Sequence, residues 1–152
     1  MLTLQQICEA AGGTLLSGNP EQAITSFHFD TRQLAAGSLF VALTSGERDG
    51  HQFLEEAKKQ GAVAALISNQ DYQLDTKLGY ILVNNTEKAF AKVAHYYRTQ
   101  LHIPIIAVTG SNGKTTTKDM IAHVLGYKKD VFKTFKNYNN HLGVPLSILQ
   151  IN

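Results

Sequence analysis

The chain has 152 residues, of which 43% are hydrophobic and 17% are charged, a composition that excludes intrinsic disorder and fibrous repeats. Its formal net charge of +2 is too small to indicate a nucleic-acid-binding surface, and no apolar stretch is long enough to suggest insertion into a membrane. Cys8 is the single cysteine, which excludes an intramolecular disulfide and fits a reducing compartment. We therefore expect a soluble, cytoplasmic, globular protein.

The first predicted element is a short helix that opens with a capping box, in which the first residue and the residue three positions later bind each other's backbone. Thr3 and Gln6 form this pattern, and Gly12 with Gly13 ends the helix. One face should pack on a core, and that face carries Leu4, Ile7, Cys8 and Ala11.

Two strands and a polar turn come next. Residues 23–29 alternate between apolar and polar side chains and residues 39–43 form a compact apolar run, so both segments are predicted strands. The turn between them contains Thr31 and Arg32. A guanidinium can bind a phosphate through two hydrogen bonds, and a hydroxyl can add another. From spacing alone, however, an ordinary solvated arginine is the more common explanation.

A polar loop over residues 44–53 leads into a predicted helix over 53–60 and a strand over 62–67. With the preceding strand these segments predict a strand–helix–strand unit of an α/β fold. His51, in the loop, could stack on a ligand or donate a hydrogen bond to it. A lone histidine near the start of a helix is more often a cap or a surface group.

A further strand is predicted over residues 80–83, followed by a long helix with Thr86 as its N-terminal cap. The helix should end near Leu101. We place a domain boundary in this region, so that residues 1–84 form an N-terminal domain and residues 85–152 begin a second domain. The apolar face of the long helix carries Phe90, Val93, Ala94 and Tyr97.

The most informative stretch reads as a buried strand, a glycine-bearing turn and a helix. Residues 105–108 are apolar and rich in β-branched side chains, as a parallel strand covered on both faces should be. Gly110 and Gly113 allow a tight turn that aims backbone N–H groups at an anion. Lys114 then opens a helix whose N-terminus adds partial positive charge. One face of this helix should pack on the sheet through Met120, Ile121, Val124 and Leu125.

Together these features predict a phosphate-binding loop. The Lys114 ammonium would reach the β- and γ-phosphates, and the Thr115 hydroxyl would bind Mg²⁺. The common P-loop pattern has a further glycine where this chain has Val108, so the loop is shorter than usual. The alternative is a strand-to-helix turn that needs glycine for geometry alone and carries an ordinary surface lysine.

A second strand of this unit, predicted over residues 131–134, leads into a segment rich in asparagine. Asn137, Asn139 and Asn140 offer amide donors and acceptors beside a glycine. Ligands collect at the carboxyl ends of parallel strands, so this segment and the phosphate loop should share a cleft. Turn chemistry accounts for the asparagines about equally well, because asparagine favours tight turns.

The loop sequence TGSNGKTTT, over residues 109–117, resembles the nucleotide loop of the Mur ligases, ATP-dependent enzymes that form amide bonds in bacterial cell-wall precursors. Related loops occur in folylpolyglutamate synthase and cyanophycin synthetase. The N-terminal part is similar to the uridine diphosphate (UDP)-binding domain shared by the last two Mur ligases of the pathway. The matching positions there are Asp30-Thr31-Arg32, residues 37–43, Gly46, Asp49-Gly50-His51 and Gly61-Ala62.

The resemblance implies a small N-terminal α/β domain that binds UDP, followed by the start of a parallel-sheet, P-loop-type ATP-binding domain. It assigns the UDP-substrate to Thr31, Arg32, Asp49, His51, Asn139 and Asn140. It assigns ATP to Gly110, Ser111, Asn112, Gly113, Lys114, Thr115 and Thr116. Within that loop Lys114 and Thr115 would be catalytic, and Thr115 would bind Mg²⁺.

Residues 137–147 and residues 117–120 resemble the branch of the family that adds D-alanyl-D-alanine to UDP-N-acetylmuramoyl-tripeptide through an acyl phosphate. The resemblance covers essentially the whole chain but only the front of the family's enzymes, so we expect a fragment that is monomeric and inactive alone. No nucleic-acid partner is expected. The alternatives are another ligase of the superfamily, adding the third peptide residue or acting on folate, and a nucleotide-binding module without catalysis.

Overall fold

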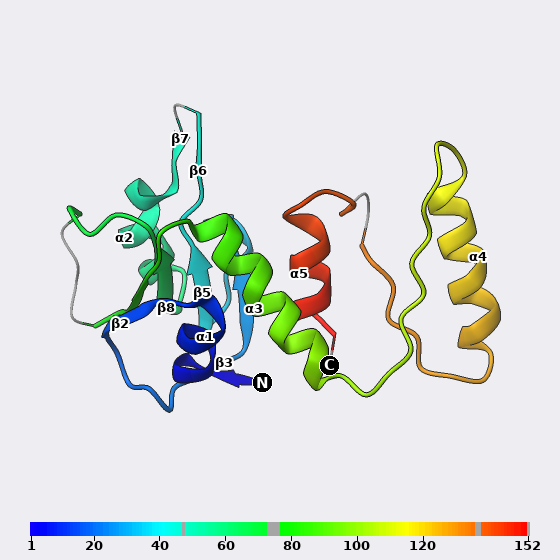
Figure 1. The fold of residues 1–152 in the computed structure, drawn as a ribbon, viewed down its shortest axis with the longest axis horizontal. Helices are drawn as coiled ribbons and strands as arrows, with labels where there is room; N and C mark the ends of the chain where they lie inside the picture. Colours follow the sequence, from blue (N-terminus) through cyan, green and yellow to red (C-terminus); the bar gives the residue numbers. More distant parts are fainter. Residues whose placement is uncertain (47, 73–76, 136–137, 152) are drawn as a thin grey trace.

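The computed structural model describes residues 1–46, 48–72, 77–135 and 138–151. A five-stranded sheet forms the centre of the larger body, with helices on both faces, and one helix stands apart from this body (Figure 1). The predicted α/β class is confirmed.

The sheet has the strand order β2-β9-β8-β5-β4. Strands β4 (Ser26–His28), β5 (Ser38–Val41), β8 (Ala62–Ile67) and β9 (Gly79–Leu82) run parallel, and β2 (Thr14–Ser17) pairs antiparallel with β9. These parallel strands lie close to the segments predicted from sequence. Because they run in one direction, the loops that follow them all leave the sheet at one edge, which we call the carboxyl edge.

Two short antiparallel pairs accompany the sheet. Strand β1 (Leu2–Thr3) pairs with β3 (Ala23–Ile24), and β6 (Thr44–Ser45) pairs with β7 (Arg48–Asp49). Sequence analysis predicted neither β1 nor the β6–β7 hairpin, because a strand of two residues is too short to show alternation.

Helix α1 (Leu4–Ala11) confirms the predicted capping box. The backbone N–H of Gln6 donates to the Thr3 hydroxyl at 3.3 Å, and the Thr3 N–H donates to the Gln6 side chain at 2.9 Å. Gly12 ends the helix at a φ of 68°, the left-handed conformation that favours glycine. The predicted apolar face of α1 is buried.

The N-terminal cap of helix α3 (Thr86–Gln100) lies one residue earlier in the sequence than predicted. The Asn85 side chain is the cap, because it accepts the N–H of Lys88 at 2.8 Å. The prediction of Thr86 as the cap is wrong. Thr86 is buried in the first turn, where its hydroxyl donates to the backbone carbonyl of Ala42 at 2.9 Å and ties α3 to the end of β5.

Helices α1, α3 and α5 (Gly143–Leu149) cover one face of the sheet. Helix α3 contributes Phe90 and Val93 to the same core as α1, and α5 contributes Leu146 and Leu149. Their partners on the sheet are Phe27, Leu39, Val41, Ala64, Leu66 and Ile81. Helix α3 therefore packs between α1 and α5, while the boundary predicted at residue 84 stays a prediction.

The other face of the sheet is covered by α2 (Leu54–Lys59), which follows the short 3-10 helix η2 (Gly50–Phe53). Leu54 and Ala57 of α2 pack in a second core with Phe40, Ala42, Ala65, Ile67 and Tyr80. The predicted strand–helix–strand unit is thereby confirmed as β5-α2-β8.

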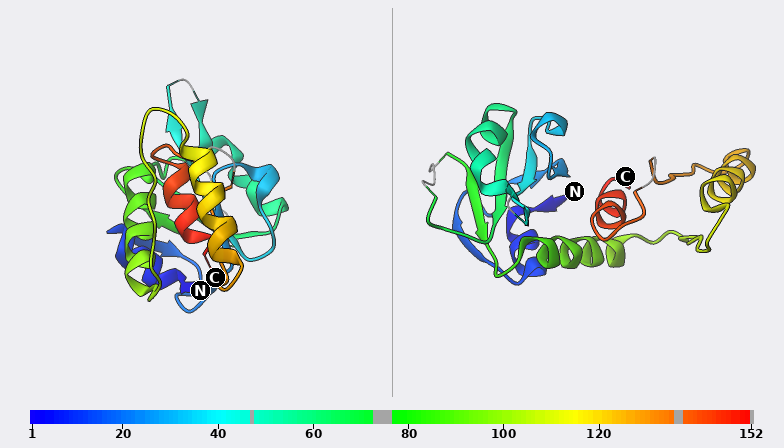
Figure 2. Two further views of the ribbon diagram at one scale, coloured as in Figure 1. Left: turned by 90° about the vertical axis from the view of Figure 1, so that its right-hand side faces the viewer. Right: turned by 90° about the horizontal axis from the view of Figure 1, so that it is seen from above.

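Helix α4 (Lys114–Gly126) lies away from the sheet, between two extended segments (Figure 2). All 13 of its residues are described and none is buried; Met120 is 64% exposed and Val124 is 70% exposed. The predicted packing of its apolar face on a sheet is therefore wrong for this structure, because no strand of the described residues lies against that face.

The two strands predicted beside α4 are also absent from the described structure. Residues 105–108 and 131–134 are extended without strand pairing, and Ile106 is 59% exposed. A parallel strand forms only when neighbouring strands take up its N–H and C=O groups. The apolar pattern of these segments is that of buried strands, but the described chain offers them no neighbours.

Candidate functional site

The carboxyl edge brings together the UDP-binding residues predicted in the N-terminal part of the chain. Thr31 and Arg32 follow β4, and Asp49 and His51 follow β5. Strands β4 and β5 are direct neighbours, with His28 opposite Phe40. The two loops therefore leave adjacent strands at the edge where ligands of parallel sheets collect.

Arg32 lies in the 3-10 helix η1 (Thr31–Gln33) and is held by Asp30, the residue that caps this helix. The guanidinium donates from Nε to Oδ1 at 2.9 Å and from Nη2 to Oδ2 at 2.7 Å, while the Arg32 backbone N–H donates to Oδ1 at 3.1 Å. The Arg32 side chain is 85% exposed. Asp30 thus fixes the direction of a guanidinium that remains open to a ligand.

Sequence analysis did not assign a role to Asp30. Hydrogen bonds from the Arg32 side chain lower the pKa of the Asp30 carboxyl to about 2, so this residue is charged at neutral pH. Its backbone N–H donates to Nδ1 of the buried His28 at 3.0 Å. A carboxylate two residues before an arginine in a turn was the available signal, because that spacing permits a two-bond pair.

Asp49, His51 and Tyr72 form a second group, which we call the Asp49 cluster. The Tyr72 hydroxyl donates to Oδ2 of Asp49 at 2.7 Å, and Nδ1 of His51 lies 2.5 Å from Oδ1. The rings of His51 and Tyr72 stack with centroids 5.4 Å apart and planes 16° apart. Tyr72 was not predicted, since it lies 23 residues from Asp49 in the sequence.

His51 is enclosed by this cluster. Its Nε2 accepts hydrogen bonds from the backbone N–H groups of Ser68 at 2.9 Å and Asn69 at 3.3 Å. The ring proton is therefore on Nδ1, which donates a hydrogen bond to the Asp49 carboxylate. The side chain is only 1% exposed. The direct ligand contact predicted for His51 is therefore not available in this structure, because both ring nitrogens are engaged inside the fold.

The Asp49 carboxylate is also charged at neutral pH. Partial burial raises its pKa, but the hydrogen bonds donated by the Tyr72 hydroxyl and by the backbone and ring of His51 act more strongly together and hold the pKa at about 2. In turn, the bond to this carboxylate raises the pKa of Tyr72. The cluster is thus a stable anion with two fixed donors.

The predicted phosphate loop leads directly into α4. Gly110 has a φ of 142° and Gly113 a φ of 74°, and the first helical residue is Lys114. The Lys114 ammonium folds over the loop and donates to the carbonyl of Gly110 at 2.6 Å and, less closely, to that of Ser111 at 3.4 Å. Ser111, Asn112, Thr115 and Thr116 are exposed.

Glycine at position 113 is required by backbone conformation and not by crowding. A Cβ there would lie 4.0 Å from the nearest atom, the Thr117 hydroxyl oxygen, but the positive φ disfavours any other residue. The loop is therefore open above a helix N-terminus and carries one ammonium group. These donors fit a phosphate chemically.

The asparagine segment lies against the N-terminal end of α3. Nε2 of His141 is 3.7 Å from a carboxylate oxygen of Glu87, in the first turn of α3. The Asn140 side-chain oxygen accepts the N–H groups of Leu142 at 3.2 Å and Gly143 at 2.7 Å, which is the turn chemistry considered above. Asn139 is exposed, and Asn137 lies outside the described residues.

Helix α4 is tied to the extended segment that follows it. The Lys118 ammonium donates to the carbonyl of Thr134 at 2.8 Å, and the Lys133 ammonium binds the Asp119 carboxylate at 2.8 Å. The hydrogen bond from Lys133 lowers the pKa of Asp119. The residues before the asparagine segment therefore lie along the helix that begins at the phosphate loop.

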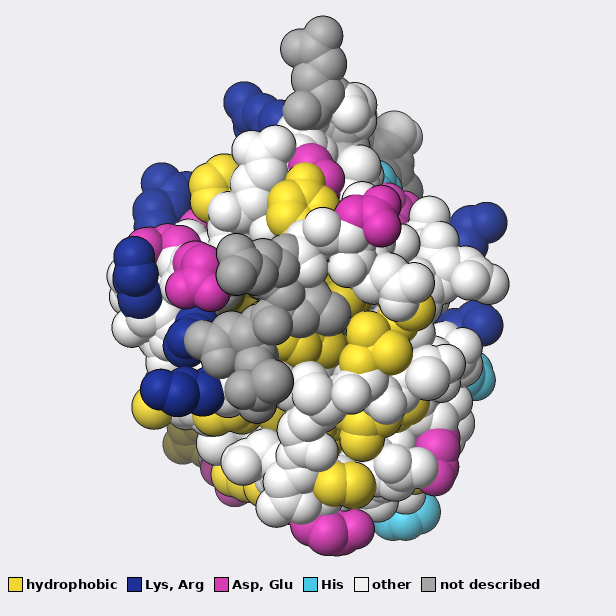
Figure 3. Space-filling model, turned by 90° about the vertical axis from the view of Figure 1, so that its left-hand side faces the viewer, with side chains coloured by type: hydrophobic (Ala, Val, Ile, Leu, Met, Phe, Trp, Pro, Cys, Tyr) yellow, Lys and Arg dark blue, Asp and Glu magenta, His cyan; other side chains and the backbone are white. Residues whose placement is uncertain are grey.

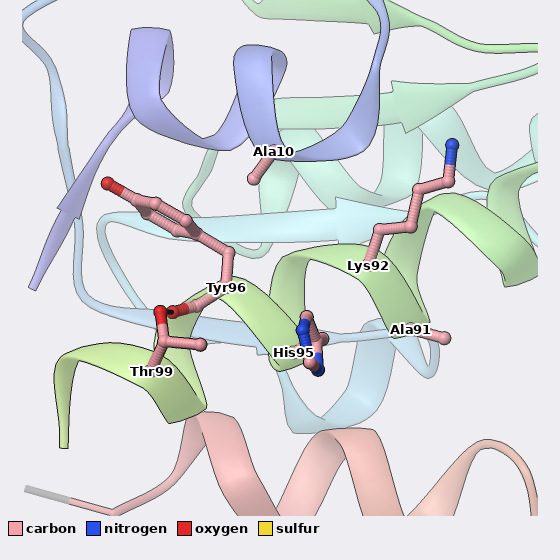
Figure 4. A pocket seen from close by; sticks show the side chains of 6 residues that line it. All are labelled: Ala10, Ala91, Lys92, His95, Tyr96 and Thr99. Atoms are coloured by element: carbon pink, nitrogen blue, oxygen red, sulfur yellow. Dashed lines mark hydrogen bonds between the residues drawn. The ribbon is translucent and has the colours of Figure 1, made fainter.

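Two hollows lie on the described surface. One, between α1 and α3, is lined by Ala10, Ala91, Lys92, His95, Tyr96 and Thr99, whose side chains do not converge on a common point (Figure 4). The other is lined at the carboxyl edge by Ser68, Asn69, Gln70, Asp71, Leu82, Val83 and Asn84. Only the second lies beside the Asp49 cluster.

On the β2 side of the molecule, the described residues form no continuous basic patch (Figure 3). Lys and Arg side chains lie around the rim of this side beside acidic ones, with hydrophobic side chains between them. Within the described ranges no three His, Cys, Asp or Glu residues gather as metal ligands, and no helix has the length and hydropathy to cross a bilayer.

Comparison with known proteins identifies the family. Residues 108–152 match the Mur ligase middle domain. The chain is 42% identical over 150 residues to the UDP-N-acetylmuramoyl-tripeptide–D-alanyl-D-alanine ligase of Bacillus subtilis, a match that covers 97% of this chain and 32% of the relative. It is 37% identical over 151 residues to the Escherichia coli ligase of the same name, covering 99% of this chain and 32% of the relative.

Solved structures agree with these sequence relatives. MurF from Acinetobacter baumannii superimposes with a TM-score of 0.87 at 31% identity over 99% of this chain and 33% of that protein. MurF ligase from Thermotoga maritima in complex with ADP gives a TM-score of 0.70 at 35% identity, over 82% of this chain and 28% of that protein. The chain thus spans about a third of the length of its relatives. It belongs to the Mur ligase family, and the sequence relatives described here are UDP-N-acetylmuramoyl-tripeptide–D-alanyl-D-alanine ligases.

Proposed function

We propose that this chain supplies the UDP-binding region and the ATP phosphate loop of a ligase that joins D-alanyl-D-alanine to UDP-N-acetylmuramoyl-tripeptide. The observation that carries the proposal is the loop of residues 110–113 at the start of α4, inside the segment that matches the Mur ligase middle domain. The exposed Arg32 at the carboxyl edge supports the assignment of the UDP-binding region.

The reaction needs ATP because a carboxylate is a poor acyl donor. Transfer of the γ-phosphoryl group to the tripeptide carboxylate gives an acyl phosphate, which the amine of D-alanyl-D-alanine attacks with release of phosphate. Phosphoryl transfer asks of the protein mainly positioning and neutralisation of charge. The chain's contribution is therefore a set of fixed donors at each end of the substrate pair.

On the ATP side, Lys114 is the principal residue. Its ammonium now binds the carbonyl of Gly110 and would turn to the β- and γ-phosphate oxygens, joined by loop N–H groups of residues 110–113 and the exposed Thr116. Mg²⁺, when bound, would neutralise charge on the phosphates. The hydroxyl of Thr115, exposed in the first turn of α4, is the ligand this chain offers it.

On the UDP side, Thr31 and Arg32 would hold the diphosphate, with the guanidinium aimed by Asp30. Asp49 and the enclosed His51 would keep the adjoining loop in place. Asn139, exposed before α5, and the side-chain amide group of Asn140 would face the substrate where the two regions meet. We place this monomeric enzyme in the cytoplasm, where peptidoglycan precursors are nucleotide-linked.

Titration calorimetry with two ligands tests the proposal. The chain should bind UDP-N-acetylmuramoyl-tripeptide, and Arg32→Ala should abolish that binding without changing the affinity for ADP with Mg²⁺. Lys114→Met should do the reverse, with Lys128→Met, on an exposed lysine beyond α4, as the matched control. The proposal would be contradicted if the unaltered chain did not bind UDP-N-acetylmuramoyl-tripeptide, or did not bind ADP with Mg²⁺.

Ligation itself is tested in a chimera in which this chain replaces the matching segment of a full-length relative. The chimera should form the pentapeptide product, and Lys114→Met in it should reduce ligation at least about hundredfold, because a charge-assisted phosphate contact is lost. Ligation that survives the loss of this ammonium would reject its catalytic role.

A further inference from the structure

Tyr72 occupies a position that joins separate segments of the carboxyl edge. It follows β8 after a short loop, and its hydroxyl reaches Oδ2 of Asp49 at 2.7 Å. Its ring stacks on that of His51, at a centroid distance of 5.4 Å. One side chain therefore contacts the β6–β7 hairpin and the 3-10 helix η2 at the same time.

Asp49 is the residue through which this contact acts on the hairpin. It pairs with Thr44 at the open end of β6 and β7, its Oδ1 lies 3.4 Å from the Thr44 hydroxyl, and it caps η2 by accepting the N–H of His51. His51 in turn accepts backbone N–H groups just beyond β8. The direction in which the hairpin leaves the sheet is thus set by the Asp49 cluster.

The hairpin and the turn that carries Arg32 begin at the same edge of the sheet. The two loops follow β5 and β4, which pair in parallel, and the hairpin projects from the carboxyl edge in Figure 1. It also carries Arg48, an exposed cation next to Asp49 in sequence. A diphosphate bound by Arg32 would lie within the field of this second loop.

We propose that Tyr72 is a positioning residue for the nucleoside diphosphate, acting through Asp49 to hold the β6–β7 hairpin beside the Arg32 turn. This inference rests on the proposed function, since it presumes that the carboxyl edge binds UDP. Tyr72 touches no reacting atom. Its hydroxyl restricts the hairpin before the ligand arrives, and so reduces the conformational entropy lost on binding.

The variant Tyr72→Phe isolates the hydroxyl. It keeps the ring that stacks on His51, and the Asp49 carboxylate, whose side chain is 27% exposed, can take a water in place of the phenol. The fold should therefore survive while the restraint on the hairpin is lost. The matched control is Tyr97→Phe, which removes a hydroxyl that donates to the carbonyl of Ile151 at 2.6 Å, at the far end of α3 from the carboxyl edge.

The experiment measures UDP affinity by titration calorimetry and the melting temperature by circular dichroism for the chain and both variants. We expect Tyr72→Phe to weaken UDP binding about tenfold, the size expected when one or two further side chains must be ordered on binding. Both variants should lower the melting temperature by similar amounts, because each loses one hydrogen bond. Tyr97→Phe should nevertheless leave the UDP affinity unchanged. Amide exchange at Ser45 and Arg48 should accelerate in Tyr72→Phe alone.

The outcomes separate this inference from the proposed function. UDP binding by the unaltered chain with the same affinity in Tyr72→Phe would overturn the positioning role and leave the proposed function standing. Equal weakening in both tyrosine variants would also overturn it, because the effect would then follow stability. No UDP binding by the unaltered chain would overturn both.

Discussion

The carboxylate of Asp30 accepts two hydrogen bonds, of 2.9 and 2.7 Å, from the guanidinium of Arg32, which lies two residues later in the chain. The pair converts a side chain with many rotamers into a directed donor at the carboxyl edge. Such an arrangement lowers the entropy lost when a diphosphate is bound. Replacement of Asp30 therefore tests whether direction, and not charge alone, matters at Arg32.

We expect Asp30→Asn to weaken UDP binding by about tenfold, since asparagine keeps a single acceptor and releases the two-bond grip. Titration calorimetry measures the effect. Asp119→Asn is the control, because Asp119 pairs with Lys133 on α4, away from the UDP region. Unchanged affinity in Asp30→Asn would show that the pair does not orient Arg32 for a ligand.

Gly113→Ala should loosen the start of α4. Alanine at the left-handed φ of 74° costs about 1 kcal/mol, and relief of that strain would unwind the loop that presents N–H groups. ADP affinity should fall with the helical circular dichroism signal. Gly126→Ala, at the other end of the same helix and with open space around the new Cβ, should leave both unchanged. A normal ADP affinity in Gly113→Ala would speak against the phosphate loop.

Thr86→Val should destabilise the body of the protein by about 1–2 kcal/mol, because the carbonyl of Ala42 loses its buried donor. Urea unfolding monitored by circular dichroism measures the change. The matched variant Thr99→Val removes an exposed hydroxyl bonded to the carbonyl of Tyr96 within α3, and should cost less. Equal losses of unfolding free energy in the two variants would mean that the hydrogen bond from Thr86 to Ala42 stabilises the protein no more than an exposed one.

The stability of the chain should depend on the charge of Asp49 in acid. Its pKa is about 2 in the folded protein against an ordinary value of 3.8, so the folded state favours the ionised form. The stabilisation is complete above about pH 4 and is lost as the pH falls towards 2. Urea unfolding at several pH values should show that the stability difference between the chain and Asp49→Asn shrinks across this window. A constant difference would contradict the depressed pKa.

Much of the N-terminal fold could be predicted because its signals are local. The capping box of Thr3 and Gln6, the apolar run of β8 and the helical spacing in α3 each lie within a few residues of sequence. Strand β2 escaped prediction because Thr14–Ser17 is only half-buried at the edge of the sheet and carries a weak pattern.

The contacts of the candidate site depend on longer distances. Nothing near Asp49 in the sequence points to Tyr72, and only the parallel order of β5 and β8 brings them together. The phosphate loop, in contrast, was predicted from adjacent residues and stays a prediction as a ligand site. The strand predicted over residues 105–108 is wrong for a different reason. Its sequence pattern is local and clear, but no neighbouring strand lies among the described residues.

The path of the chain around α4 has a mechanical consequence. The chain leaves the core at the end of α3 and returns to it at α5, and these two helices run in the same direction in one core: Glu87 faces His141 near their starts and Tyr97 binds Ile151 near their ends. Helix α4 is thus connected at both ends to one hydrophobic core, through α3 on one side and α5 on the other. Because the chain connects α4 to this core at both ends, both connections limit how far Lys114 can move relative to the core.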